Sequence, residues 1–192
     1  MSLNLYSLLE KSASEHDHLC PRQVLGVRMG LAGLAALEVK PPVTTKTALI
    51  IVETDGCFVD GIRAVTGATV GHRTLRIQDL GKIAATFTDL KSETSLRLVP
   101  KPDIRIRALE FAPDETRRYF AQLKGYEVMP DGELFYFQKV DLKTPPSQIM
   151  SHQIARAICS GCGEEIMNER EAVVDGKVLC HTCAFGGYYR LS

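Results

Sequence analysis

The sequence contains no tryptophan, no low-complexity tract and no excess of charge, since 23 basic side chains balance 23 acidic ones over 192 residues. Without a net field, bulk charge argues against a nucleic-acid or anionic-membrane partner. The longest apolar stretch, 24–39, includes Arg28 and Glu38, so no segment reaches the length of a membrane span. The first ten residues lack the pattern of a signal peptide. We therefore expect a cytoplasmic protein whose six cysteines are metal ligands or reactive thiols rather than disulfides.

Hydrophobic periodicity predicts an α+β core domain over residues 1–143, with a mixed sheet packed against helices. Helices cluster early in the chain and strands later. The expected helices span 4–15, 23–38, 57–65 and 113–124, and the expected strands span 47–53, 75–78, 83–89, 95–99, 104–109 and 134–140.

Two glycines, Gly26 and Gly30, lie about one turn apart on the second expected helix. Each weakens that helix by roughly 1 kcal/mol relative to alanine. Close approach of another backbone is one compensation, and the alternative is that both are simply tolerated.

Residues 144–192 are predicted to form a linker, marked by Pro145 and Pro146, and a small zinc-ribbon domain. Two Cys-x-x-Cys pairs separated by seventeen residues match the spacing of zinc sites; their members are Cys159, Cys162, Cys180 and Cys183. Between them, Asp175-Gly176 predicts a hairpin that returns the second pair beside the first. Four thiolates leave no open position on the ion, so we expect structural zinc. The alternatives are a rubredoxin-like iron site, two dithiols, or His181 replacing one cysteine.

The local charge of the ribbon favours a protein partner over nucleic acid. Four cationic side chains between residues 156 and 192 face five anionic ones, and a zinc ion with four thiolates adds further negative charge. The aromatic segment 185–189 offers apolar surface for docking onto the core domain or onto a partner chain.

A second group of candidate ligands lies in the core domain. His16, His18 and Cys20 alternate, so an extended backbone would place all three on one side. Pro21 is suited to open the next helix, which would put Cys20 at a helix N-terminus, where the thiolate is favoured. Continuation of the first helix to His18 would instead separate these side chains.

Cys57 occupies a similar place, in the first turn of a helix that Asp55 or Thr54 is expected to cap, and Asp60 shares its helical face. If Cys57 and Cys20 converge, the pocket suits a soft transition metal or a nucleophilic cysteine with a histidine base. The candidate catalytic residues are Cys57, Cys20 and His18. For each residue alone, a structural role is the alternative.

Several ordered motifs resemble the FmdE family, named after the FmdE component of molybdenum or tungsten formylmethanofuran dehydrogenase. They are His16-Asp17-His18-Leu19-Cys20-Pro21, Glu53-Thr54-Asp55-Gly56-Cys57-Phe58-Val59-Asp60, Thr66-Gly67-Ala68-Thr69-Val70-Gly71 and Gly81-Lys82. The resemblance implies an α+β core, an intertwined homodimer and a candidate site at His16, His18, Cys20 and Cys57, with Asp55 and Asp60 nearby. Asp17, Ala68 and His72 depart from the family's usual glycine, cysteine and lysine.

Three functional hypotheses follow. The first is a metal-binding accessory or cofactor-handling component of molybdenum or tungsten redox enzymes, with zinc in the ribbon and a second metal or small ligand in the core. The second is a metal-sensing regulator or adaptor that engages a partner through the ribbon. The third is an enzyme with Cys57 or Cys20 as its nucleophile.

Overall fold

The computed structural model describes residues 4–14, 16, 18–150 and 155–189. The chain divides into two compact units, Met1–Ile149 and Met150–Ser192, whereas the sequence places the boundary between residues 143 and 144. None of the helices that the structure describes is long and apolar enough to cross a bilayer.

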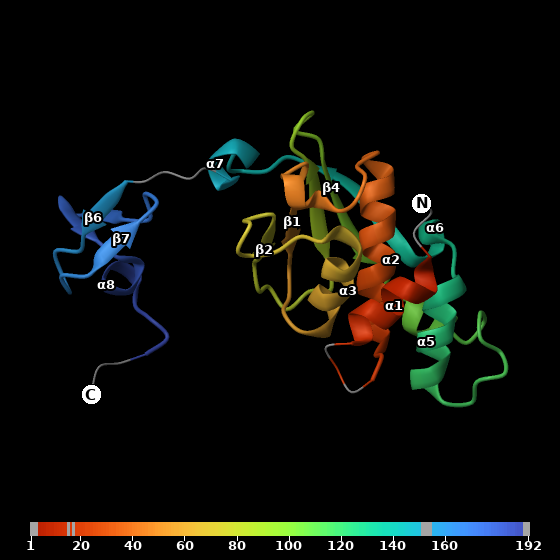
Figure 1. Ribbon diagram of the computed structural model, residues 1–192. Helices are drawn as coiled ribbons and strands as arrows, with labels where there is room; N and C mark the ends of the chain where they lie inside the picture. Colours follow the sequence, from red (N-terminus) through yellow and green to blue (C-terminus); the bar gives the residue numbers. More distant parts are fainter. Residues whose placement is uncertain (1–3, 15, 17, 151–154, 190–192) are drawn as a thin grey trace. The chain divides into compact units, whose positions relative to one another are not determined.

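A five-stranded mixed sheet forms the first unit's framework (Figure 1). In spatial order its strands are β2 (Leu75–Ile77), β1 (Ala48–Val52), β3 (Ala85–Asp89), β4 (Ser95–Pro100) and β5 (Phe135–Val140). Only the β1–β2 pair is parallel, and the other neighbours are antiparallel. The mixed sheet, its helices and the small C-terminal unit confirm the predicted fold class.

Helix α3 (Cys57–Thr66) connects the two parallel strands. It begins after Gly56, whose φ is 76°, and ends at Gly67, whose φ is 65°. The predicted cap was wrong, because Gly56 is the N-cap residue and no side chain caps the helix. The β1–α3–β2 unit therefore places Cys57 directly beyond the carboxyl end of β1.

Helix α2 (Pro21–Ala36) packs against α3, α1 (Leu5–Ala13) and the sheet (Figure 1). A Cβ atom added at Gly26 would lie 2.2 Å from the Phe58 carbonyl oxygen, and one added at Gly61 would lie 2.9 Å from the Gly26 Cα. The predicted backbone approach is thus confirmed at Gly26, whereas Gly30 faces the Val65 side chain. The contact holds the beginnings of α2 and α3 beside each other.

The segment between β4 and β5 differs from the prediction. Residues 104–109 are not a strand: Ile104–Arg107 forms the short helix α4, because the chain has already passed the end of β4 and no strand lies alongside to pair with it. The alternation that predicted a strand leaves Ile104 buried and Ile106 exposed. Helix α5 (Arg118–Val128) begins five residues later than predicted, and α6 (Asp131–Leu134) follows it.

The 3-10 turn η1 (Val43–Thr45) precedes β1, and α7 (Pro146–Met150) follows β5. Helix α7 therefore begins within the predicted linker, because proline is well suited to the first turn of a helix. The second unit contains β6 (Arg156–Ile158), β7 (Glu165–Met167), β8 (Ala172–Val174), β9 (Lys177–Leu179) and α8 (His181–Phe185). The β8–β9 hairpin turns through Asp175 and Gly176, both with positive φ, as predicted.

Candidate functional sites: a thiol cavity and a four-cysteine cluster

A cavity of about 450 Å³ in the first unit contains both core cysteines; we call it the thiol cavity. It lies where the beginnings of α2 and α3 meet α4 and α5. Its lining residues are His18, Cys20, Pro21, Arg22, Leu25, Cys57, Ile83, Arg105, Tyr119, Gln122 and Tyr126. Three of the predicted site residues, His18, Cys20 and Cys57, therefore share one cavity.

Cys20 is held by the geometry of the α2 N-terminus. It is the N-cap residue, with an extended backbone (φ −117°, ψ 156°), and Pro21 opens the helix as predicted. The Cys20 amide donates to Gln23 Oε1 at 2.7 Å, and Gln23 Nε2 donates to the Ser12 carbonyl oxygen at 2.8 Å. Because Gln23 is completely buried, this connection fixes the start of α2 against α1.

Burial and neighbouring groups change the pKa values of Cys57 and of a nearby phenol. Burial raises the pKa of Cys57, and the neighbouring Cys20 thiol raises it further, while Arg22 opposes the shift weakly. Burial and then both thiols also raise the pKa of Tyr119, whose hydroxyl donates to the Leu19 carbonyl oxygen at 3.1 Å. Without a metal, Cys57 is therefore a protonated thiol at neutral pH, despite its place in the first turn of α3.

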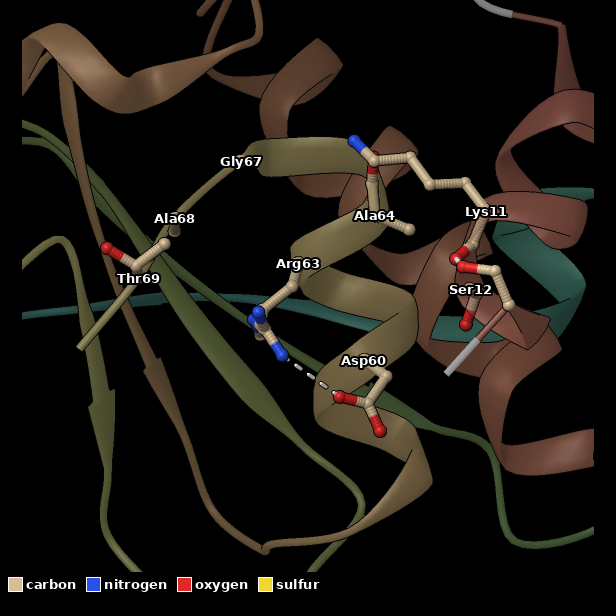
Figure 2. A pocket seen from close by; sticks show the side chains of 9 residues that line it. Lys11, Ser12, Asp60, Arg63, Ala64, Gly67, Ala68 and Thr69 are labelled. Carbon is tan, nitrogen blue, oxygen red and sulfur yellow. Dashed lines mark hydrogen bonds and ion pairs between the residues drawn. The ribbon is translucent and has the colours of Figure 1, made fainter. Parts of the chain in front are cut away.

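A second cavity, of about 310 Å³, lies between α1, α3 and the segment after α3 (Figure 2). Asp60 and Arg63 reach it from α3 and are joined by an ion pair of 3.3 Å, while Lys11 approaches from α1. The Lys11 ammonium donates to the Ala64 carbonyl oxygen at 2.9 Å. His16 is held here too, because its Nε2 lies 2.8 Å from Asp60 Oδ2.

The structure thus divides the predicted core residues. His18, Cys20 and Cys57 line the thiol cavity, whereas Asp60 lines the second cavity with His16 bound to it. Asp55 lies in the turn between β1 and α3 and lines neither cavity. Asp17 lies outside the described residues.

Sequence reasoning missed Tyr119, Gln122 and Arg105 in the thiol cavity. Arg105 comes from α4, where a strand was predicted, and Tyr119 and Gln122 come from α5, a helix that was predicted with earlier bounds. No motif in the sequence associates these residues with the cysteines.

The four ribbon cysteines form the second site. Their Sγ atoms all lie within 4.8 Å of one another, and those of Cys162 and Cys180 are 3.9 Å apart. A tetrahedral zinc ion with bonds of about 2.3 Å requires sulfur separations of about 3.8 Å, so the residues fit zinc. Among the described residues this is the only group of three or more potential ligands gathered so closely.

Backbone groups assemble this cluster. Ser160 donates its amide to the Val178 carbonyl oxygen at 2.8 Å, which ties the first cysteine pair to strand β9. The Cys180 amide donates to Cys159 Sγ at 3.2 Å. Amide donation from Cys180 and from Cys162 lowers the pKa of the Cys159 thiol to about 6, which favours the thiolate that zinc requires. His181 is not a ligand; its ring packs against Phe185 at the start of α8.

Two family models match the chain, one over each unit. Residues 15–136 match the family described as "FmdE, Molybdenum formylmethanofuran dehydrogenase operon". Residues 155–189 match the prokaryotic dksA/traR C4-type zinc finger, so this unit is a zinc finger and its cysteines are the expected zinc ligands.

Two individual proteins resemble the chain over nearly its whole length. A "Probable S-adenosyl-L-methionine-binding protein" of Archaeoglobus fulgidus is 30% identical over 96% of the chain, which spans only 54% of that relative. The crystal structure of an FmdE-like protein of the tungsten formylmethanofuran dehydrogenase type, from Syntrophus aciditrophicus, has a TM-score of 0.64 at 22% identity. It is matched over 98% of this chain and 96% of that one, and the likeness concerns the fold.

Proposed function

The chain belongs to the FmdE family, and on that basis we propose that it serves molybdenum or tungsten redox enzymes, such as formylmethanofuran dehydrogenase, as a metal-binding accessory or cofactor-handling component. The ribbon zinc is structural, because four thiolates complete its coordination. The activity of the protein is therefore expected in the first unit.

The observation that carries this proposal is the convergence of His18, Cys20 and Cys57 on one cavity. Two thiols and an imidazole are ligands for soft or borderline transition metals. They do not form a group as closely gathered as the ribbon cysteines. His18 is exposed, so its side chain is able to turn toward the thiols. A bound metal would also favour deprotonation of Cys57, against the effect of burial.

Metal analysis of the purified protein tests the core site. We expect two metal ions per chain in the wild type, one in Cys57→Ser, and loss of the ribbon zinc alone in Cys159→Ser. The last variant is the matched control, because it also removes one thiol. One zinc ion per chain in both wild type and Cys57→Ser would contradict a resident core metal.

A homodimer is the assembly we propose, since the FmdE resemblance implies one. Large apolar side chains are exposed beside the parallel edge of the sheet, namely Val70, Ile77 and Leu80. Their burial in a second copy would remove apolar surface from water. Light scattering of the zinc-loaded chain tests the assembly, and a monomer at micromolar concentration would contradict it.

The ribbon supports a second candidate function, that of a metal-sensing adaptor. Phe185 and Tyr188 are 69% and 100% exposed, and aromatic residues are enriched at protein interfaces. We propose a protein partner in the cytoplasm, where reduced thiols persist. Loss of partner capture in Phe185→Ser, with zinc retained, would support this function, whereas salt-dependent retention of DNA would favour nucleic acid instead.

A further inference from the structure

Two arginine side chains line the thiol cavity. Arg22 reaches it from the first turn of α2, and Arg105 from α4. Among the residues that the structure describes, neither guanidinium makes a hydrogen bond or an ion pair, and no carboxylate lines the cavity. By contrast, the first unit pairs several arginines with acidic groups; these are Arg28, Arg63, Arg97 and Arg107.

We propose that the thiol cavity binds an anionic small molecule, one that presents a carboxylate or an oxyanion to Arg22 and Arg105. This inference rests on the proposed function, in that it names the ligand class of the same cavity. It concerns the charge that the arginine side chains give to the cavity.

The electrostatics of the cavity support this selection. Arg22 and Arg105 contribute two positive charges, and none of the described residues that line the cavity is a carboxylate that would offset them. Guanidinium groups match carboxylates and oxyanions in geometry as well as in charge.

The remaining lining suits a small organic ligand. Gln122 and the exposed His18 provide polar groups, while buried Leu25 and Tyr126 provide an apolar wall. The volume of about 450 Å³ falls within the usual range for small-molecule sites and is much larger than a bare metal ion requires.

A pair of alkylating reagents that differ in charge tests the proposal. Iodoacetate is an anion and iodoacetamide is neutral. Both alkylate the thiolate: a sulfur–carbon bond forms, the carbon–iodine bond breaks and iodide leaves. We measure their rates at Cys57 and Cys20 by peptide mass spectrometry on the full chain with its ribbon zinc bound. Each ratio of iodoacetate to iodoacetamide rates is divided by the ratio for the same cysteine in denatured protein.

We expect this normalised ratio to exceed one in the wild type and to fall in Arg22→Gln and Arg105→Gln. For a unit charge about 7–9 Å from the reacting thiolate, at an effective dielectric constant of about 40 to 80, the ratio changes by about 2- to 7-fold. The ratio should also fall as salt rises from about 0.05 M to about 0.5 M. Arg22→Lys keeps the charge and should keep most of the effect.

Lys91→Gln is the matched control, because it removes one positive charge from the exposed turn between β3 and β4 and should leave the ratio unchanged. The proposal is overturned if the wild-type ratio is one, or if the double variant Arg22→Gln/Arg105→Gln retains the wild-type value. Protection of Cys57 from iodoacetamide by S-adenosyl-L-methionine, which is a net cation, but not by malonate or sulfate would overturn it equally. The core metal site is tested separately, because its absence would show as one metal ion per chain in the metal analysis and would not by itself change the alkylation ratio.

Discussion

Replacing Gly26 by alanine should force α2 and α3 apart. The new methyl group would lie 2.2 Å from the Phe58 carbonyl oxygen and 3.0 Å from the Gly61 Cα. Ordinary carbon–oxygen contacts are about 3.3 Å, so the two backbones must separate by about 1 Å at this point. The obstructing atoms belong to backbone and have no rotamer through which to move away.

The magnitude follows from two opposing effects. Overpacking a well-filled interior costs about 1–3 kcal/mol, and the backbone contact puts this site at the upper end. The higher helix propensity of alanine offsets up to about 1 kcal/mol of this loss in stability. We expect a net loss of about 2 kcal/mol in the free energy of unfolding of the first unit, and a decrease of about 4–8 °C in its Tm.

Circular dichroism during thermal and urea unfolding of the zinc-loaded chain measures this loss. Gly132→Ala is the control, because a Cβ at that helical position meets nothing within 4 Å, and its stability should be unchanged or slightly higher. The displacement should also expose Cys57, whose alkylation should become faster. Wild-type stability in Gly26→Ala would refute the close approach of the two helices.

Three further predictions concern ionisable groups. Chelation of zinc or Cys159→Ser should unfold residues 155–189 while the amide NMR spectrum of the first unit stays unchanged, because metal binding supplies much of the folding free energy of so small a unit. Arg97 lowers the pKa of Glu53 in the folded state, so their pairing stabilises the fold above about pH 4.5 and the benefit is lost as the pH falls through the lower folded value. Glu53→Gln should lower the free energy of unfolding by about 2 kcal/mol at pH 7. In urea unfolding at different pH values, this variant should also lose less stability than the wild type below about pH 4.5. Since the pKa of Cys57 is raised, the pH profile of its alkylation should have a higher midpoint in folded than in unfolded protein, and coincident profiles would contradict the burial argument.

Local patterns predicted much of this protein. Residue spacing alone indicated the ribbon, because a Cys-x-x-Cys turn brings two sulfurs to one ion, and Asp175-Gly176 allows the positive φ angles of the hairpin. Hydrophobic periodicity likewise indicated β1 and α3. In each case the cause lies within a few residues of its effect.

The prediction failed where the outcome depended on distant neighbours. Alternating residues at 104–107 suit a strand, yet a strand requires a partner, and the sheet offers none beyond Pro100. The separation of His16 from His18 likewise depends on Asp60, which lies on a helix far along the chain. Periodicity contains no information about such partners.

Most elements, the cluster of four ribbon cysteines and the family relationship were therefore readable from short segments, because backbone geometry and ligand spacing act locally. The thiol cavity was not, since Cys20, Cys57, Arg105 and Tyr119 come together from four separate helices or helix starts. Their convergence depends on the contact between Gly26 and Gly61, where missing side chains allow two backbones to meet. Folding alone brings these distant charges and thiols into one cavity.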